Sequence, residues 1–230
     1  MSGDNILDFR KIVICFSELG EKKLFKKTIK EINTNKRVYL YYSNSGNIPI
    51  CAMPKLKLVL ASRHGFLSFC FNFFSFIKLS NINININPHT IKTIAKCILS
   101  HEVGHILDPN ISNAKYEYAD ILSNIIDKLI EYNIDITNNN FHKDNLPSDL
   151  EMYVVDLKKN LINRESRAWD IGKTIIDLEN EKEKIIFNKV REYALATYNY
   201  GNIKSIVKEH NIDVFFKYKR YLAWLYIRIL

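Results

Sequence analysis

Two histidines and a glutamate stand close together in the segment CILSHEVGHILDP, residues 97–109. If the segment is helical, His101 and His105 lie four positions apart on one face, so both imidazoles can bind one metal ion. Glu102 lies one step around the helix, where its carboxylate can reach a water molecule on that ion. This is the H-E-x-x-H pattern, in which two histidines bind zinc and the glutamate acts as a general base. We therefore expect Zn²⁺ at this segment.

Apolar positions before the motif indicate that the two imidazoles face the interior. Three isoleucines share their helical face: Ile91, Ile94 and Ile98. Buried imidazoles need polar partners, and a metal ion would supply one. Gly104 costs about 1 kcal/mol relative to alanine in mid-helix, so we interpret it as a point where another backbone or a substrate passes close by. The alternative interpretation is two core histidines with ordinary hydrogen bonds.

A catalytic zinc ion usually has three protein ligands, so a third is expected elsewhere in the chain. Position 111, six residues after His105, is isoleucine, and the other histidines have no recognisable spacing: His64, His89, His142 and His210. An acidic ligand is therefore favoured, and four acids are candidates: Asp108, Glu117, Glu151 and Glu165. Cys97, one turn before His101, would be the fourth ligand of a closed structural site or a thiolate that blocks zinc.

Glu165 differs from the other three acids because it interrupts an apolar row. The row has helical spacings of three and four: Leu150, Val154, Leu157, Leu161, Glu165, Ala168, Gly172 and Ile175. A buried carboxylate is costly without a partner, and zinc would be that partner. An ion pair with Arg164 or Arg167 is the alternative. The small side chains at Ala168 and Gly172 would let a second helix approach closely.

The stretch HEVGHILDP followed by ESRAWDIG resembles the ImmA/IrrE-type gluzincin metallopeptidases, over roughly residues 82–178. In that family an HExxH helix is joined by a glutamate from a later helix, which corresponds here to Glu165. The resemblance implies a zincin-like fold and zinc-dependent hydrolysis of peptide bonds in a protein or peptide, in several relatives a bound repressor or antitoxin. In thermolysin-like relatives an acid four residues after this ligand steadies a zinc histidine, whereas this chain has Trp169 there and Asp170 next.

The expected mechanism uses Glu102 to take a proton from the attacking water and to deliver it to the leaving amine. Three side chains are candidates for stabilising the oxyanion: Tyr153, Tyr193 and His142. A non-enzymatic alternative is a zincin-like zinc-binding protein that acts by binding a partner.

The elements around the motif predict an α+β fold in one domain, residues 1–230. Residues 1–87 should form helix plus a small, mostly antiparallel sheet that packs on the HExxH helix. Helix is expected over the first forty residues, and strands are expected at 37–42, 55–62, parts of 66–76, and 81–87. The last of these, NINININ, alternates polar and apolar residues, which is typical of a strand. We expect it to be the sheet edge that binds an extended peptide.

Residues 88–230 should form a helical portion that contains the metal site. Asn87 can cap the motif helix and Pro88 can occupy its first position, with Pro109 ending it. Further helices are predicted at 114–132, from about 147 to 179, and at 214–230. The last has an apolar stripe beside basic residues, so a membrane-surface protein is a third functional class.

The composition of the chain limits the type of protein, its location and its partners. The chain has 47% hydrophobic and 25% charged residues, as in a globular protein. We expect a cytoplasmic protein with free thiols, since no signal peptide or spanning segment is evident and the four cysteines are scattered. The net charge is +8, and much of it lies in residues 21–37, where Phe25, Ile29 and Ile32 have helical spacing. We interpret that segment as a solvated helix face and expect no nucleic-acid partner.

Overall fold

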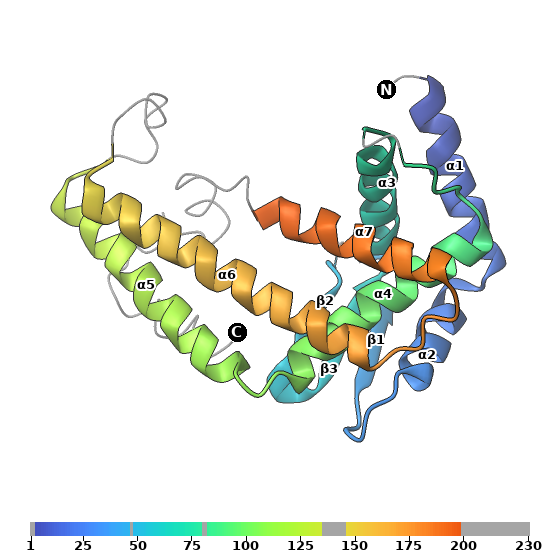
Figure 1. Ribbon diagram of the computed structural model, residues 1–230, viewed down its shortest axis with the longest axis horizontal. Coiled ribbons are helices and arrows are strands. Elements are labelled where there is room, and N and C mark those ends of the chain that lie inside the picture. The colour runs from blue at the N-terminus through green and yellow to red at the C-terminus, as the bar shows by residue number, and fades with distance from the viewer. Residues whose placement is uncertain (1–2, 47, 80–81, 135–145, 199–230) are drawn as a thin grey trace. The chain divides into compact units, whose positions relative to one another are not determined.

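A computed structural model describes residues 3–46, 48–79, 82–134 and 146–198 (Figure 1). The described residues form a mixed α+β structure, mostly helical, with a sheet of three strands. Contacts divide the described residues into two compact units, one within residues 3–108 and 166–194, the other within residues 109–165 and 195–198. We call these unit 1 and unit 2. The division falls inside one continuous helix, between Glu165 and Ser166.

Unit 1 begins with two helices, α1 (Gly3–Glu18) and α2 (Glu21–Glu31), so the helix predicted over the first forty residues is confirmed as far as Glu31. Their apolar faces meet in an aromatic cluster with the start of the third helix. The ring of Phe66 lies 4.6 Å from that of Phe16 and 5.2 Å from that of Phe25, measured between centroids. All three rings are fully buried. This cluster fixes α2 with its lysine-rich side toward solvent.

The sheet has the order β1-β3-β2, with β1 at Tyr39–Ser43, β2 at Cys51–Met53 and β3 at Leu58–Ser62. A short 3₁₀ turn, Pro54–Leu56, joins β2 to β3. The strands predicted at 37–42 and 55–62 are therefore confirmed over residues 39–42 and 58–62, whereas residues 55–56 lie in the 3₁₀ turn. The prediction of a mostly antiparallel sheet is wrong, because β1 pairs with β3 in parallel over five residue pairs and only β2 is antiparallel. Side-chain alternation sets which face is buried but carries no information on strand direction.

Two predicted strands are absent from the described residues. The stretch 66–76 lies within helix α3 (Arg63–Leu79), so the assignment of parts of it as strand is wrong. The buried residues of α3 follow helical spacing: Phe66, Leu67, Cys70, Phe73, Phe74 and Ile77. Residues 82–87 also form no strand, although their isoleucines are half-buried and Asn83 and Asn85 are exposed. The amide of Ile82 donates to the carbonyl of Ile77, and that of Ile84 to Ile82, so the alternation occurs without a neighbouring strand. The prediction that this stretch forms an edge strand of the sheet is therefore wrong for residues 82–87.

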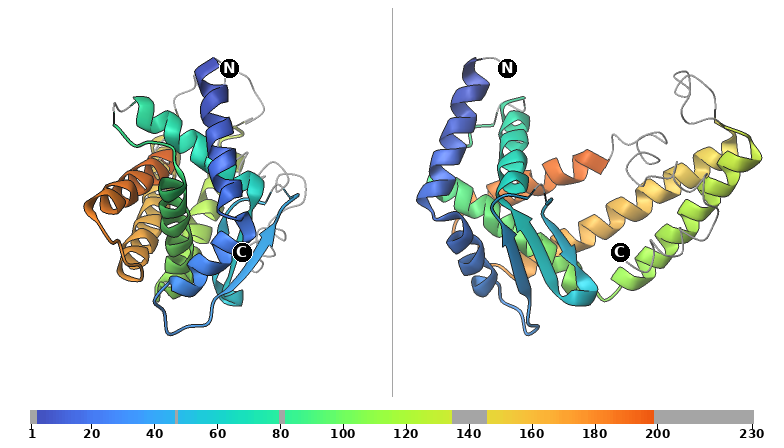
Figure 2. Two further views of the ribbon diagram at one scale, coloured as in Figure 1. Left: turned by 90° about the vertical axis from the view of Figure 1, so that its right-hand side faces the viewer. Right: turned by 180° about the vertical axis from the view of Figure 1, so that it is seen from behind.

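The motif helix α4 (Pro88–Leu107) starts and ends where the sequence predicts. The side-chain oxygen of Asn87 accepts a hydrogen bond from the amide of Thr90 at 2.9 Å, and Pro88 occupies the first turn. Asp108 caps the other end, directly before Pro109. Within unit 1, α4 lies between the sheet on one side and the C-terminal part of α6 with α7 on the other (Figures 1 and 2).

Helix α6 (Ser148–Thr174) and helix α7 (Glu181–Thr197) complete the fold. The predicted helix over 147–179 ends five residues early, and α7 was not predicted. In unit 2, α5 (Ile111–Glu131) packs on the first part of α6. The apolar core there consists of Ile125, Leu129, Leu150, Val154 and Leu157. The helix predicted at 214–230 lies outside the described residues. None of the helices in the described ranges has the length and apolar character to cross a membrane.

Candidate metal centre

The two motif histidines lie side by side on α4. Their ring centroids are 4.6 Å apart, and the planes are inclined at 69°. His101, Glu102 and His105 are all buried, with exposed fractions of 7%, 8% and 7%. Ile91, Ile94 and Ile98 are buried on the same helix, as predicted. The imidazoles therefore continue the buried stripe into the core of unit 1.

The structure brings Glu165 to these histidines. One ligand atom each of His101, His105 and Glu165 lies within 4.8 Å of the others, and all three residues are buried. Glu165 directly precedes Ser166 in the continuous helix α6, and the next residues of that helix contact α4 within unit 1. Its position relative to the histidines therefore follows from the helix itself.

This donor set fits zinc. Two imidazole nitrogens and one carboxylate oxygen are the ligands of many catalytic zinc sites, with a fourth position open. Tetrahedral coordination at bond lengths of about 2.0–2.1 Å separates neighbouring ligand atoms by about 3.3 Å. The observed separations, up to 4.8 Å, are within reach of that value through side-chain rotation. A divalent cation would also offset the cost of burying the carboxylate.

Helices α4 and α6 touch through their backbones beside this cluster. A methyl group at Gly104 would overlap the carbonyl oxygen of Ala168 and lie 2.9 Å from its carbonyl carbon. A methyl group at Gly172 would lie 2.9 Å from the carbonyl oxygen of Ser100. The interpretation of Gly104 as a point of close backbone approach is thus confirmed, and so is that of Ala168 and Gly172. Without these small residues the two helices could not approach so closely.

Trp169 holds the ring of His101 from the α6 side. The two rings are stacked, with centroids 4.3 Å apart and planes inclined at 17°. Phe187 of α7 packs against the indole edge at 5.5 Å. Asp170, the next residue, is exposed and forms an ion pair with Arg191 at 2.8 Å. An aromatic contact therefore orients His101 at the position where an acid stands in thermolysin-like proteins.

The other three acids considered as the third ligand are either paired with another side chain or exposed far from the histidines. Asp108 is buried and accepts a hydrogen bond from Nε of Arg167 at 3.2 Å. Glu117 accepts one from the side-chain amide of Asn160 at 2.8 Å. Glu151 is exposed. It precedes Glu165 by fourteen residues, or about 21 Å of helix.

Two alternatives to the three-ligand zinc site involve Cys97 and Arg164. Cys97 is fully buried and lies outside the cluster of possible ligands found in the described residues. Burial raises the pKa of its thiol, which opposes formation of a thiolate. The predicted ion-pair alternative has partial support, since Nη2 of Arg164 lies 3.7 Å from Oε1 of Glu165.

Glu102 lies within electrostatic range of strand β2. Burial, together with the carboxylate of Glu102, raises the pKa of Cys51, which is half-buried on that strand. The proximity of β2 to the motif helix was not predicted, because it depends on how β2 pairs with β3. No sequence spacing signals it.

The two tyrosines proposed for oxyanion stabilisation pack in other parts of the described structure. Tyr193 packs among Phe69, Phe73 and Phe76 of α3. Tyr153 packs on the apolar core of unit 2. It is twelve residues from Glu165, or about 18 Å along α6. His142 lies outside the described residues. The structure thus assigns neither tyrosine to the metal centre, and the prediction for His142 stays untested.

Comparisons with protein families, with curated proteins and with solved structures found no match. Functional inference therefore depends on the geometry of the site and on the motif itself.

Proposed function

We propose that this protein is a zinc-dependent metallopeptidase that hydrolyses peptide bonds in a protein or peptide substrate. The observation that carries the proposal is the buried cluster of His101, His105 and Glu165, with Glu102 beside it on the same helix. An HExxH helix joined by a glutamate from a later helix is also the arrangement that the resemblance to ImmA/IrrE-type gluzincins implies.

His101, His105 and Glu165 would hold the ion. Zinc bound there would supply Lewis acidity and lower the pKa of a water molecule toward neutrality. Glu102 accepts the proton of the attacking water and transfers it to the leaving amine. Because Glu102 is buried, bulk water screens its interaction with the reacting atoms less than it would at the surface.

Two contacts keep the proposed ligands in position. The stacked indole of Trp169 restricts rotation of the His101 ring. The close contact of Gly104 with Ala168 limits sliding of α6 along α4 and so holds Glu165 near the histidines. A site held by packed helices stays precise during a reaction cycle.

A non-catalytic role is the second candidate. The ion pair between Arg164 and Glu165 favours it, because Arg164 compensates part of the buried charge without any metal. The protein would then act through partner binding. Because a non-catalytic protein could also bind zinc, metal content alone does not separate the two candidate functions, and peptidase activity must be measured on the same samples.

The test is the variant Glu102→Gln, assayed for zinc content and for cleavage of a mixed peptide library by mass spectrometry. The amide keeps the shape of the side chain but cannot accept the proton, so cleavage should fall by about 10²–10⁴-fold while zinc content stays unchanged. Asp170→Asn, an exposed acid on the same helix as Glu165, is the matched control and should retain both. Normal cleavage by Glu102→Gln would refute the role of Glu102. Zinc-loaded wild-type protein that cleaves nothing would favour the non-catalytic candidate.

A further inference from the structure

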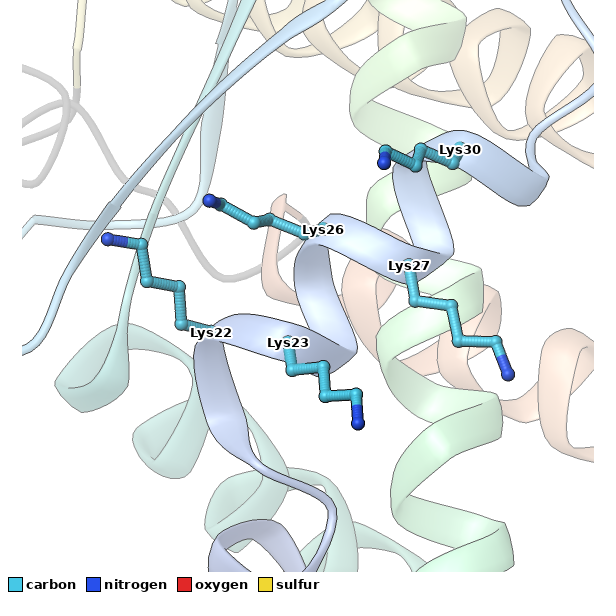
Figure 3. Close-up of a pocket in the computed structure, with 5 residues that line it drawn as sticks. All are labelled: Lys22, Lys23, Lys26, Lys27 and Lys30. Carbon is cyan, nitrogen blue, oxygen red and sulfur yellow. The ribbon is translucent and has the colours of Figure 1, made fainter.

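Helix α2 presents a face made only of lysines. Five of them line an open hollow along the helix, and all five are exposed: Lys22, Lys23, Lys26, Lys27 and Lys30 (Figure 3). At 3.6 residues per turn they fall within an arc of about 140°, and the first and last are about 12 Å apart along the axis. Leu24 and Phe25 lie opposite this arc and are buried in unit 1. We call the five residues the lysine face.

Little of this charge is neutralised within the protein. Glu21 is engaged by the hydroxyl of Tyr42 and by Nε of Arg63, each at 3.0 Å. Glu31 pairs with Lys27 at 3.7 Å. Within the described ranges the other four lysines form no ion pair. A concentrated positive field therefore faces solvent and favours an anionic partner.

The chemistry of the lysine face excludes several kinds of partner. Insertion into a membrane needs apolar side chains beside the charges, and the apolar residues Leu24 and Phe25 are occupied in the core. Protein interfaces are enriched in aromatic residues and arginine and depleted of lysine. Adenine is read by amide side chains and single strands are bound by aromatic stacking, and the lysine face carries neither kind of side chain. The lysine face offers only mobile point charges, which suit phosphate oxygens.

We propose that the lysine face binds the phosphate backbone of double-stranded nucleic acid, without sequence preference. A duplex carries one phosphate charge per roughly 1.7 Å, so a stretch of about 12 Å offers about seven charges to the five lysines. The exposed helix face expected from the sequence is confirmed. The proposed partner departs from the expectation, also drawn from the sequence, that the protein binds no nucleic acid. The proposal is independent of the peptidase proposal, since no lysine of the face belongs to the metal centre.

The test measures binding of the full-length protein to a labelled 25-base-pair duplex by fluorescence anisotropy, at about 50 and 200 mM salt. One variant replaces Lys22, Lys26 and Lys30 with glutamine. The matched control replaces three exposed lysines on other elements, Lys55, Lys159 and Lys173, and so removes the same charge. Anionic vesicles of phosphatidylserine and phosphatidylcholine are tested in parallel by co-sedimentation.

Wild-type affinity should fall by about 10²–10³-fold between the two salt concentrations, as expected for four or five phosphate contacts. The lysine-face variant should bind at least about tenfold more weakly at low salt, with a log–log salt slope smaller by about 2.7, and the control should match the wild type. Absence of duplex binding at low salt, or equal losses in both variants, would overturn the proposal. Vesicle binding that depends on the lysine face and exceeds duplex binding would assign the face to membranes instead.

Discussion

The two halves of helix α6 bury their inner faces in opposite ways. In unit 2 the buried face carries large aliphatic side chains, including Leu150 and Leu157, which pack on Ile125 and Leu129 of α5. In unit 1 the same helix presents small residues, and its backbone touches that of α4 at Gly104. Glu165 stands at the boundary between the two halves.

The difference suggests that the unit 2 half of α6 mainly stabilises the fold, whereas the unit 1 half fixes the position of the proposed ligands. Interdigitated aliphatic side chains stabilise a helix pair but tolerate small shifts, because they can repack. Backbone contact through glycine and alanine leaves no such freedom. The rigid half is the half that carries Trp169 and adjoins Glu165, which is consistent with a site that needs its ligands fixed to within a fraction of an ångström.

The largest expected effect is that of Gly104→Ala. Alanine normally stabilises a helix interior by about 1 kcal/mol over glycine, but here its methyl group would overlap the carbonyl oxygen of Ala168. We expect a loss of more than about 3 kcal/mol in the free energy of unfolding, measured by chemical denaturation. Gly172→Ala meets a less severe contact and should lose less. Stabilisation by Gly104→Ala would show that the helices do not touch there.

The variant Leu157→Ala tests the half of α6 that lies in unit 2 and packs through aliphatic side chains. It removes a fully buried side chain from the core of unit 2 and should destabilise the protein by about 3 kcal/mol, because a cavity remains. Val155→Ala, at an exposed position of the same helix, should change little. Zinc affinity should be unaffected by either change. A loss of zinc in Leu157→Ala would mean that the two halves do not act separately.

Added zinc should stabilise only the rigid half. At a free concentration about one hundred times the dissociation constant, binding contributes about 2.7 kcal/mol, or about a hundredfold slower exchange of protected amides. Hydrogen exchange should therefore slow in residues 98–106 and 166–172 and stay the same in residues 120–130. Uniform slowing across both regions, or none, would contradict this division.

The smallest effect is expected at the surface of unit 2. Hydrogen bonds from Lys128 and Tyr132 hold the pKa of Asp149 below its usual range. A carboxyl with a lowered folded-state pKa contributes stability above its unfolded pKa and loses it as pH falls through the folded value. Asp149→Asn should thus lower the denaturation midpoint slightly at neutral pH, and the difference should vanish in strong acid. A difference that grows on acidification would refute the assignment.

Local signals in the sequence were sufficient for the motif helix. Asn87 and Pro88 marked its start, and Gly104 marked the close contact that the structure shows. The row that includes Glu165 is buried at Leu150, Val154, Leu157 and Ala168, as expected. Side-chain spacing along one helix records which face is buried, so these features could be predicted without a partner.

Features that depend on a distant partner could not be predicted in this way. Residues 82–87 alternate like a strand but have none beside them, and β1 is parallel to β3 although no local pattern gives strand direction. Helix α3 was mistaken for strand because Phe69 and Phe76, which pack on Tyr193, fill the gaps between its buried positions. The buried residues of α3 nonetheless recur three or four positions apart, which is the spacing of a helix.

The most direct test of the metal centre is zinc stoichiometry by inductively coupled plasma mass spectrometry. Wild-type protein produced with zinc should carry one ion per chain, and so should the rival-ligand variant Glu151→Gln. Glu165→Gln should retain far less, since it removes one of the three ligand side chains that lie within 4.8 Å of one another. Wild-type protein without zinc, or Glu165→Gln with a full complement, would contradict the proposed centre.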